Sequence, residues 1–212
     1  MNISIIGTGN IGSGLAHTLA RTNHKVTVAG IADGDGPALA EKLAAEKKVK
    51  VQGTTVAHAI KGADIVVLAV PYAAVAELAK IADFSGKTVV DVTNPIKADF
   101  SGIVIGHTSS AAEEVQKLLP KAKVVKAFNT VFAEVYEQGL NFGGQKVPAF
   151  VASDDADAKS SVISFANDAG FDAVDSGPLK NARYIEPLGY LNIQFGYMLG
   201  RGTQIAPAWL SR

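Results

Sequence analysis

Short runs of aliphatic and β-branched residues alternate along the chain with stretches in which apolar residues recur every three to four positions. The runs predict buried strands at 3–6, 25–29, 64–70, 87–92, 123–128, 148–152 and 171–174. The stretches predict helices at 13–20, 37–47, 73–82, 111–119, 155–169 and 179–199. Strands that alternate with helices predict an α/β fold of the Rossmann type, with a doubly wound, mostly parallel sheet covered on both faces.

We expect the chain to divide into two parts. Residues 1–150 would form the dinucleotide-binding domain, and residues 151–212 a small C-terminal helical part. The segment 179–199 is unusually apolar, with residues such as Leu191 and Phe195 at helical spacing. An apolar helix that follows a complete sheet must pack on its own domain or on a second subunit. We favour the second subunit and therefore expect a homodimer.

A glycine-rich turn follows the first predicted strand and leads into the first predicted helix. Gly7 permits the tight turn, Gly9 lets a pyrophosphate approach the backbone, and Gly12 lets the helix lie close to the sheet. The pyrophosphate would sit at the helix N-terminus, where N–H groups and the helix dipole favour an anion. The order of strand, turn, helix and second strand predicts a cofactor site lined by Gly7, Thr8, Gly9, Asn10, Ile11 and Gly12.

The stretch after the second predicted strand bears on which nicotinamide cofactor would bind. An acidic residue here binds the ribose 2′-hydroxyl of NAD, whereas a basic residue accommodates the 2′-phosphate of NADP. The segment 29–36 contains Asp33 and Asp35 and no basic residue. Either aspartate could accept a hydrogen bond from the hydroxyl and would repel a phosphate, which favours NAD(H). Equally, both aspartates could face solvent in a flexible loop.

Three further turns follow predicted strands, at the edge of the sheet where ligands bind in this fold. The turns are Val70-Pro71-Tyr72, Asn94-Pro95 and Asn129-Thr130. Tyr72 could flank the cofactor, Asn94 could meet its ribose or amide, and Asn129 could face the reacting ring. Each of these residues is also common in turns that bind nothing, so it is their shared position that makes them candidates.

Acid–base residues do not form a recognisable set. His107 precedes a predicted helix, but Ser109 or Ser110 beside it is first of all a helix cap. Asp154 and Asp155 are interpreted as caps of the helix that follows them. Hydride transfer between two cofactors depends on the alignment of two rings more than on proton transfer by the protein. We therefore predict no catalytic side chain.

Composition narrows the classes of partner. The chain has 212 residues, with 20 Lys and Arg against 20 Asp and Glu, so no net charge attracts nucleic acid or an anionic membrane. It has no Cys and four scattered His, which argues against thiolate chemistry and against a metal site. Only Met1 and Asn2 precede the first apolar run, and no run is long enough to span a bilayer. We expect a cytoplasmic protein that acts on a small-molecule substrate.

Several segments together resemble the NADPH-dependent oxidoreductases of the coenzyme F420 (deazaflavin) family, whose domain also occurs in membrane ferric reductases. The segments are 6–12, 69–72, 124–130 and 175–183, the last followed by the apolar helix. The resemblance covers nearly the whole chain and implies a Rossmann domain with a small C-terminal part that packs in a homodimer. It also implies NADP along the glycine turn and Pro71-Tyr72, a deazaflavin beside Asn129-Thr130, and direct hydride transfer between the two rings.

Two positions differ from the family pattern. Members usually carry a Ser-Arg pair that holds the 2′-phosphate, where this chain has Gly30-Ile31-Ala32, and Asn129 stands where archaeal members have a His. The cofactor is therefore expected to be NADP or NAD, and the acceptor a deazaflavin, a flavin or another small molecule. The sequence predicts an oxidoreductase that transfers hydride between them. The alternative is a nucleotide-binding sensor or regulatory module without turnover.

Overall fold

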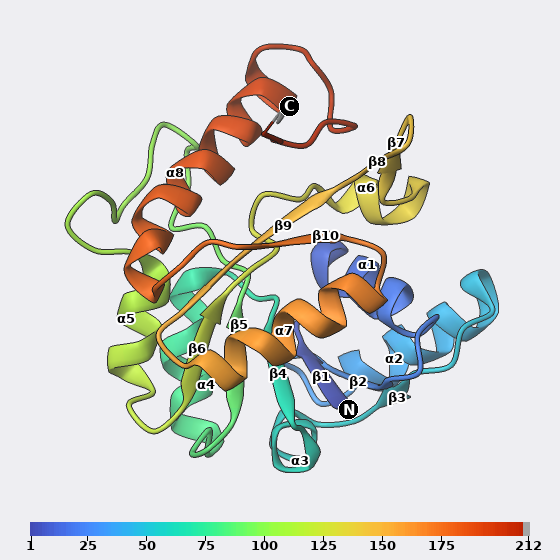
Figure 1. Cartoon of the computed structure of the whole chain (residues 1–212). Helices are drawn as coiled ribbons and strands as arrows, with labels where there is room; N and C mark the ends of the chain where they lie inside the picture. Colours follow the sequence, from blue (N-terminus) through green and yellow to red (C-terminus); the bar gives the residue numbers. More distant parts are fainter. Residues whose placement is uncertain (210–212) are drawn as a thin grey trace.

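The computed structural model describes residues 1–209 and has an eight-stranded sheet at its centre (Figure 1). The strand order is β10-β9-β6-β5-β4-β1-β2-β3, and neighbouring strands run parallel except for the antiparallel pair β6 and β9. The strands are β1 (Asn2–Ile6), β2 (Lys25–Ala29), β3 (Gln52–Gly53), β4 (Ile65–Leu68), β5 (Thr88–Asp91), β6 (Lys123–Lys126), β9 (Pro148–Ser153) and β10 (Asp172–Asp175). The predicted doubly wound, mostly parallel α/β sheet is confirmed.

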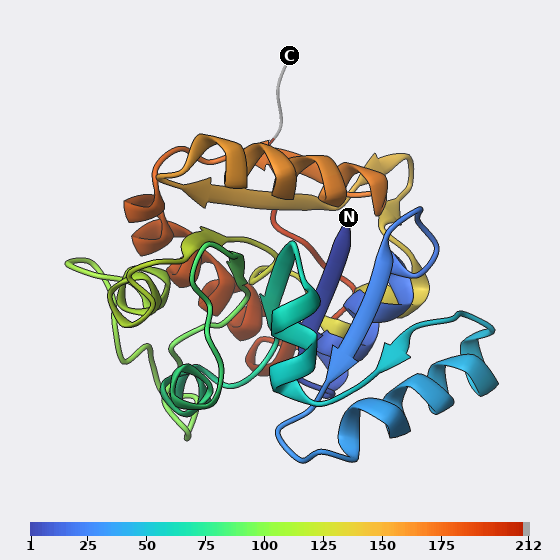
Figure 2. The same cartoon turned by 90° about the horizontal axis from the view of Figure 1, so that it is seen from below.

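Helices cover both faces of the sheet. The strand side chains that point to either face are therefore apolar. Ile3 and Ile5 of β1 pack in one core with α1, α2, α6 and α7, while Ile6 packs in a second core with α3, α4 and α5. The helices are α1 (Asn10–Leu19), α2 (Asp35–Lys42), α3 (Val56–Gly62), α4 (Val75–Ile81), α5 (Ala111–Leu118), α6 (Ala133–Gln138), α7 (Ala156–Asp168) and α8 (Ala182–Ile193). Figures 1 and 2 both show α7 lying along β9.

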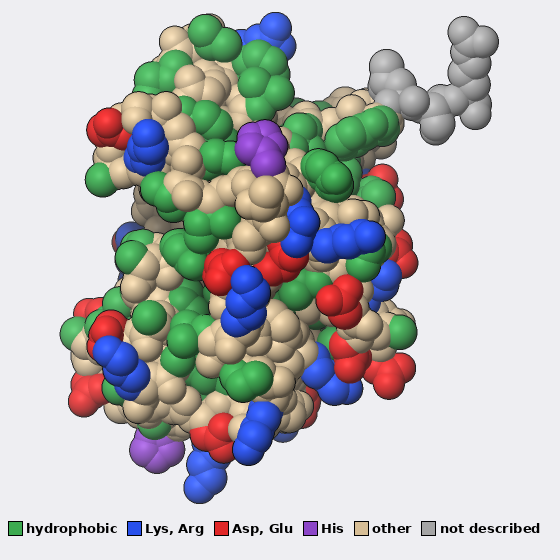
Figure 3. All heavy atoms as spheres, turned by 90° about the vertical axis from the view of Figure 1, so that its left-hand side faces the viewer, with side chains coloured by type: hydrophobic (Ala, Val, Ile, Leu, Met, Phe, Trp, Pro, Cys, Tyr) green, Lys and Arg blue, Asp and Glu red, His purple; other side chains and the backbone are tan. Residues whose placement is uncertain are grey.

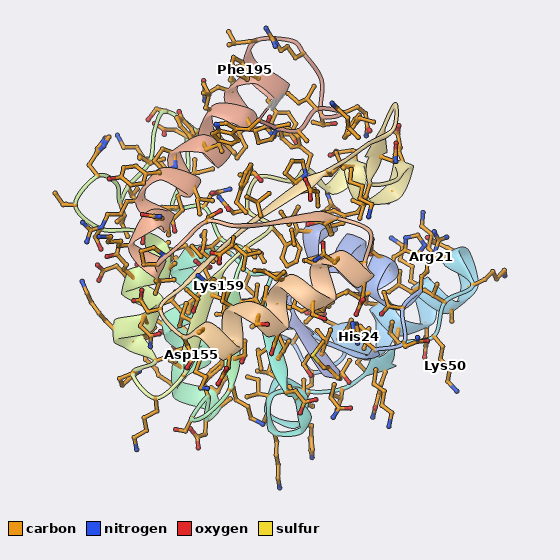
Figure 4. All side chains as sticks on the ribbon, viewed as in Figure 1. Arg21, His24, Lys50, Asp155, Lys159 and Phe195 are labelled. Atoms are coloured by element: carbon orange, nitrogen blue, oxygen red, sulfur yellow. The ribbon has the colours of Figure 1, made fainter. Side chains whose placement is uncertain are left out.

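Helix caps predicted from the sequence are present at two helices. The Asp155 carboxylate accepts a hydrogen bond from the Ala158 N–H at 2.8 Å and caps α7. One turn later, Lys159 Nζ lies 2.8 Å from the Asp175 carboxylate on β10; Figure 4 labels both Asp155 and Lys159. Ser110 caps α5 in the same way. Asp154 does not cap α7, because its carboxylate accepts from the N–H of Leu179 instead.

The sequence prediction omitted several short elements. They are β3, α3, α6 and the hairpin of β7 (Asn141–Phe142) and β8 (Gln145–Lys146). The stretch 37–47 was predicted as one helix. Its first part belongs to α2, and Leu43–Lys47 form a wider, π-helical turn. The predicted helix 179–199 is a short 3₁₀ turn at Leu179–Asn181, then α8, then a wide turn at Gln194–Met198. Each omitted helix has seven residues or fewer, too short to show a helical period clearly.

The C-terminal part of the chain is built onto the sheet. The division expected near residue 150 stays a prediction; β9 runs across that point and pairs with β6. Beyond β10, α8 lies above the carboxyl ends of the parallel strands in Figure 1. No helix within residues 1–209 is both long enough and apolar enough to cross a membrane.

Candidate dinucleotide and substrate site

The turn after β1 has a backbone that glycine alone accommodates at two positions. Gly7 has φ of +123°, and a Cβ there would lie 2.1 Å from the carbonyl oxygen of Ala69. A Cβ on Gly12 would lie 2.0 Å from the carbonyl oxygen of Gly7, so Gly12 lets α1 approach the turn. These contacts agree with the roles predicted for the first and third glycines of a dinucleotide-binding turn.

Gly9 faces open space and begins the helix. It is the N-cap of α1, with extended backbone, and no side chain forms a capping hydrogen bond there. A Cβ on Gly9 would meet no atom within 4 Å. The first turn of α1 therefore presents N–H groups and a positive dipole end beside an unfilled space, which fits a pyrophosphate.

A cavity of about 410 Å³ opens beside this turn, between α1, α2 and α6. Its lining consists of Thr8, Asn10, Ser13, Asp35, Ala38, Leu39, Lys42, Ala133, Glu134 and Glu137. The structure thus brings the turn residues Thr8 and Asn10 together with one of the two candidate aspartates, Asp35. Asp33 is exposed on the loop before α2 and does not line this cavity.

A second cavity, of about 260 Å³, lies at the carboxyl edge of the sheet. It shares Asn10 and Ala133 with the first cavity. Its lining consists of Asn10, Ile11, Val92, Asn94, Phe128, Asn129, Thr130, Val131, Phe132, Ala133, Gly189, Asn192, Ile193 and Tyr197. Five of the predicted site residues beyond the glycines (Asn10, Ile11, Asn94, Asn129 and Thr130) therefore line one cavity.

Two asparagines from neighbouring strands form a pair in this second cavity. Asn94 Nδ2 donates to the Asn129 carbonyl oxygen at 2.8 Å, and Asn129 Nδ2 donates to Asn94 Oδ1 at 2.9 Å. Asn129 Nδ2 also donates to the carbonyl oxygen of Ile185 in α8 at 3.0 Å. The mutual bonds fix the two amides relative to each other, and they tie both strand ends to α8.

Helix α8 and the turn after it contribute site residues that the sequence prediction missed. A Cβ on Gly189 would lie 2.8 Å from both Asn129 Nδ2 and Asn94 Oδ1, so the absence of a side chain makes room for the pair. Asn192 Nδ2 donates to the Thr130 carbonyl oxygen at 3.0 Å, and Tyr197 also lines the cavity. A signal existed in the sequence: Gly189 and Asn192 are three apart, and both break the apolar character of the segment.

A buried cluster of charges lies below the asparagine pair. Lys126 Nζ at the end of β6 is 2.9 Å from the Asp91 carboxylate and 2.9 Å from the Glu186 carboxylate, and it also donates to the Thr93 carbonyl oxygen. Glu186 in α8 accepts hydrogen bonds from N–H groups at the start of α5. Burial alone would lower the pKa of Lys126, but the two carboxylates raise it. Burial raises the pKa of Glu186, against the opposing effect of Lys126.

Other candidate residues lie near the site without lining either cavity. Val70 packs against the Gly7 turn, because its Cγ1 is 3.3 Å from where a Cβ of Gly7 would be. Tyr72, after Pro71, begins a 3₁₀ turn, and burial raises the pKa of its phenol. Pro95 is buried beside Asn94. Cofactor contacts by these residues and by Asp33 stay predictions.

The acid–base candidate His107 lies away from both cavities. His107 is exposed, has φ of +62° and lines neither cavity. Within the described part of the chain, no three His, Asp or Glu side chains are grouped as metal ligands.

Comparison with known proteins places the chain among characterised oxidoreductases. The family model described as "NADP oxidoreductase coenzyme F420-dependent" matches residues 2–95. The F420-dependent NADP reductase of Methanothermobacter marburgensis is 31% identical over 202 residues, which cover 89% of this chain and 89% of the reductase. The chain belongs to the coenzyme F420-dependent NADP oxidoreductase family.

Two other relatives show how far the family likeness extends. A crystal structure of an Arthrobacter sp. FB24 protein, provisionally assigned as an F420-dependent NADP reductase, superposes with a TM-score of 0.82. It is 29% identical to this chain and covers all of it. The metalloreductase STEAP3 of Rattus norvegicus is 29% identical over 88% of this chain, but the match covers 36% of STEAP3. The chain therefore spans about a third of that relative and most of the archaeal one. The family resemblance drawn from the sequence is confirmed.

Proposed function

We propose that the chain is an oxidoreductase that binds a nicotinamide dinucleotide at the glycine turn and transfers hydride between it and a small acceptor. One observation carries the proposal: the cavity beside the glycine turn shares two lining residues, Asn10 and Ala133, with the cavity lined by the Asn94–Asn129 pair. A dinucleotide held at its pyrophosphate by the turn would extend towards both cavities. The archaeal relatives are named for NADP, and NAD(H) is the alternative that the sequence favours locally.

The lining of the second cavity supports an acceptor that needs no carboxylate, imidazole or ammonium partner from the protein. This lining is made of apolar side chains, the hydroxyls of Thr130 and Tyr197, and the amides of four asparagines. The asparagines are Asn10, Asn94, Asn129 and Asn192. Among the described residues, no Asp, Glu, His or Lys lines the second cavity. A reduced nicotinamide supplies the hydride, and the residues of the cavity would orient the two rings. A deazaflavin or flavin, whose own ring spreads the added charge, fits such a lining.

The test is oxidation of NADPH or NADH by a deazaflavin, FMN or FAD, compared between the natural protein and Gly189→Val. The valine side chain would collide with Asn94 and Asn129 and misplace the acceptor. A misplacement of about 1 Å costs on the order of 100-fold in rate, so kcat/KM should fall by about that factor. The dissociation constant of the dinucleotide, measured by nicotinamide fluorescence, should rise by a smaller factor than kcat/KM falls, because the glycine turn holds the pyrophosphate.

Gly62→Val is the control, because a Cβ at Gly62 in α3 meets no atom within 4 Å. Undiminished turnover by Gly189→Val would show that hydride transfer occurs elsewhere. Tight dinucleotide binding with no turnover of any acceptor would favour a sensor or regulatory module.

A homodimer formed through α8, in the cytoplasm, completes the proposal. One side of α8 packs on the sheet, whereas Tyr184 and Leu191 on its other side are 72% and 47% exposed. Figure 3 shows apolar side chains gathered over α8 and the loop beside it.

Sedimentation at micromolar concentration should give a dimer, and Leu191→Glu should shift it to monomer. Ile81→Glu, on an exposed apolar residue of α4, should not; a monomeric natural protein would contradict the interface.

A further inference from the structure

We propose that the larger cavity selects NADH over NADPH and that Asp35 decides the choice. The inference rests on the proposed function, since it names which dinucleotide the same site takes. It also separates this chain from relatives that are named for NADP. Asp35, the charge balance of the cavity and an unpartnered carboxylate oxygen each support it.

Asp35 lies beside Gly30, the residue that follows β2. It occupies the first turn of α2, and its Oδ2 accepts a hydrogen bond from the Ala32 N–H at 3.3 Å. Its Cβ fills the space beside Gly30, where any side chain would lie 2.2 Å from it. In this fold the adenosine ribose lies at the end of the second strand, and an acidic residue there binds the 2′-hydroxyl. Asp35 is therefore close to the place of this contact, and its hydrogen bond from Ala32 orients the carboxylate.

The charge balance of the cavity opposes a second phosphate. Three carboxylates line it, from Asp35, Glu134 and Glu137, against one ammonium group, from Lys42. No Lys or Arg occurs in the segment 26–41, which leads from β2 into α2. A 2′-phosphate monoester carries between one and two negative charges near neutral pH, so it would enter a region of like charge.

An unpartnered oxygen in the same lining favours a hydroxyl. Glu134 Oε2 is buried and has no hydrogen-bond partner among residues 1–209. A carboxylate oxygen only accepts hydrogen bonds, so a donor must satisfy it. A ribose hydroxyl can donate, whereas the oxygens of a phosphate dianion cannot. This acceptor is on α6 and Asp35 is on α2, so each of these two helices offers a carboxylate oxygen to a hydroxyl donor in the cavity.

Parallel fluorescence titrations with NADH and NADPH test the inference. The natural protein should bind NADH at least tenfold more tightly, because one like charge a few ångströms away costs on the order of tenfold in affinity. The gap should narrow as KCl is raised, since salt screens the repulsion. Asp35→Asn keeps the size of the side chain and an acceptor for Ala32, and it should reduce the NADH preference about tenfold. Glu134→Gln should shift the ratio in the same direction.

Glu41→Gln is the matched control. It removes a carboxylate from the same helix, at an exposed residue that does not line the cavity, and it should leave the ratio unchanged. Equal or tighter binding of NADPH by the natural protein would overturn the inference and leave the proposed function standing. An NADH preference that survives in both Asp35→Asn and Glu134→Gln would overturn the role of these carboxylates. Failure to bind either dinucleotide would overturn the proposed function itself.

Discussion

Replacing Gly9 with Asp is expected to abolish dinucleotide binding without weakening the fold. Because a Cβ at Gly9 meets no atom within 4 Å, the new side chain displaces nothing in the protein. Gly9 is the N-cap of α1, a position where Asp normally stabilises a helix. The same carboxylate would occupy the space and take up the N–H groups that a pyrophosphate needs. The dissociation constant of the dinucleotide should rise at least about 100-fold, while the melting temperature stays level or increases.

Gly9→Asn separates charge from size in this test. Asparagine has nearly the shape of aspartate and is also a favourable N-cap, but it does not repel a phosphate. Its dissociation constant should lie between those of the natural protein and Gly9→Asp. Both variants are measured by nicotinamide fluorescence titration, with thermal unfolding as the check on folding. Wild-type affinity in Gly9→Asp would show that the pyrophosphate does not lie at this turn.

The glycine turn could be predicted because its causes are local. The positive φ of Gly7 belongs to the turn itself, and Gly12 is required by the carbonyl oxygen of Gly7, five residues earlier. The flanking strand and helix also show clear patterns. The β7–β8 hairpin is as local and was nevertheless missed. Its Gly143-Gly144 turn, with positive φ at both residues, is a strong hairpin signal, but the strands it joins have two residues each.

The substrate cavity could be predicted only in part, because its walls come from distant parts of the chain. Asn94 and Asn129 were candidates because parallel strands bring their carboxyl ends to one edge. Their pairing was not predictable, because it depends on Gly189 of α8. No local sequence pattern shows where α8 lies relative to the sheet. The apolar character of α8 suggested a second subunit, yet Gly189 and Asn192 on its buried side line the cavity.

The buried charge cluster also joins residues that are distant in the sequence, and it could not be predicted at all. Lys126 lies in a predicted strand between apolar residues, where a lysine normally marks an exposed position. Its partners, Asp91 and Glu186, are 35 and 60 residues away along the chain, so only the tertiary structure shows that all three are buried. Their arrangement ties β5, β6, α5 and α8 together beneath the asparagine pair.

Lys126→Met is expected to destabilise the protein more than any other single change considered for it. Methionine fills a similar volume but leaves the carboxylates of Asp91 and Glu186 buried without their counter-ion. Removing one partner of a buried ion pair costs about 3–5 kcal/mol of unfolding free energy. Lys123→Met is the control on the same strand, because Lys123 pairs with Asp155 at the surface, where such a bridge is worth about 1 kcal/mol or less.

The pH dependence of the unfolding free energy of Lys126→Met tests whether uncompensated charge causes the loss of stability. Burial already raises the pKa of Glu186, and the loss of the lysine removes the charge that opposes this rise. A carboxyl group whose folded pKa exceeds its unfolded pKa makes the native state most stable below the unfolded value, near 4.5, and that stability is lost as pH rises through the folded pKa. The deficit measured by urea unfolding should therefore shrink as the pH is lowered from 7 towards about 5. Asp91→Asn added to Lys126→Met should recover part of the stability at pH 7, since it removes one unpaired charge. A deficit that is the same at both pH values and in the double variant would mean that lost packing, and not uncompensated charge, sets the cost.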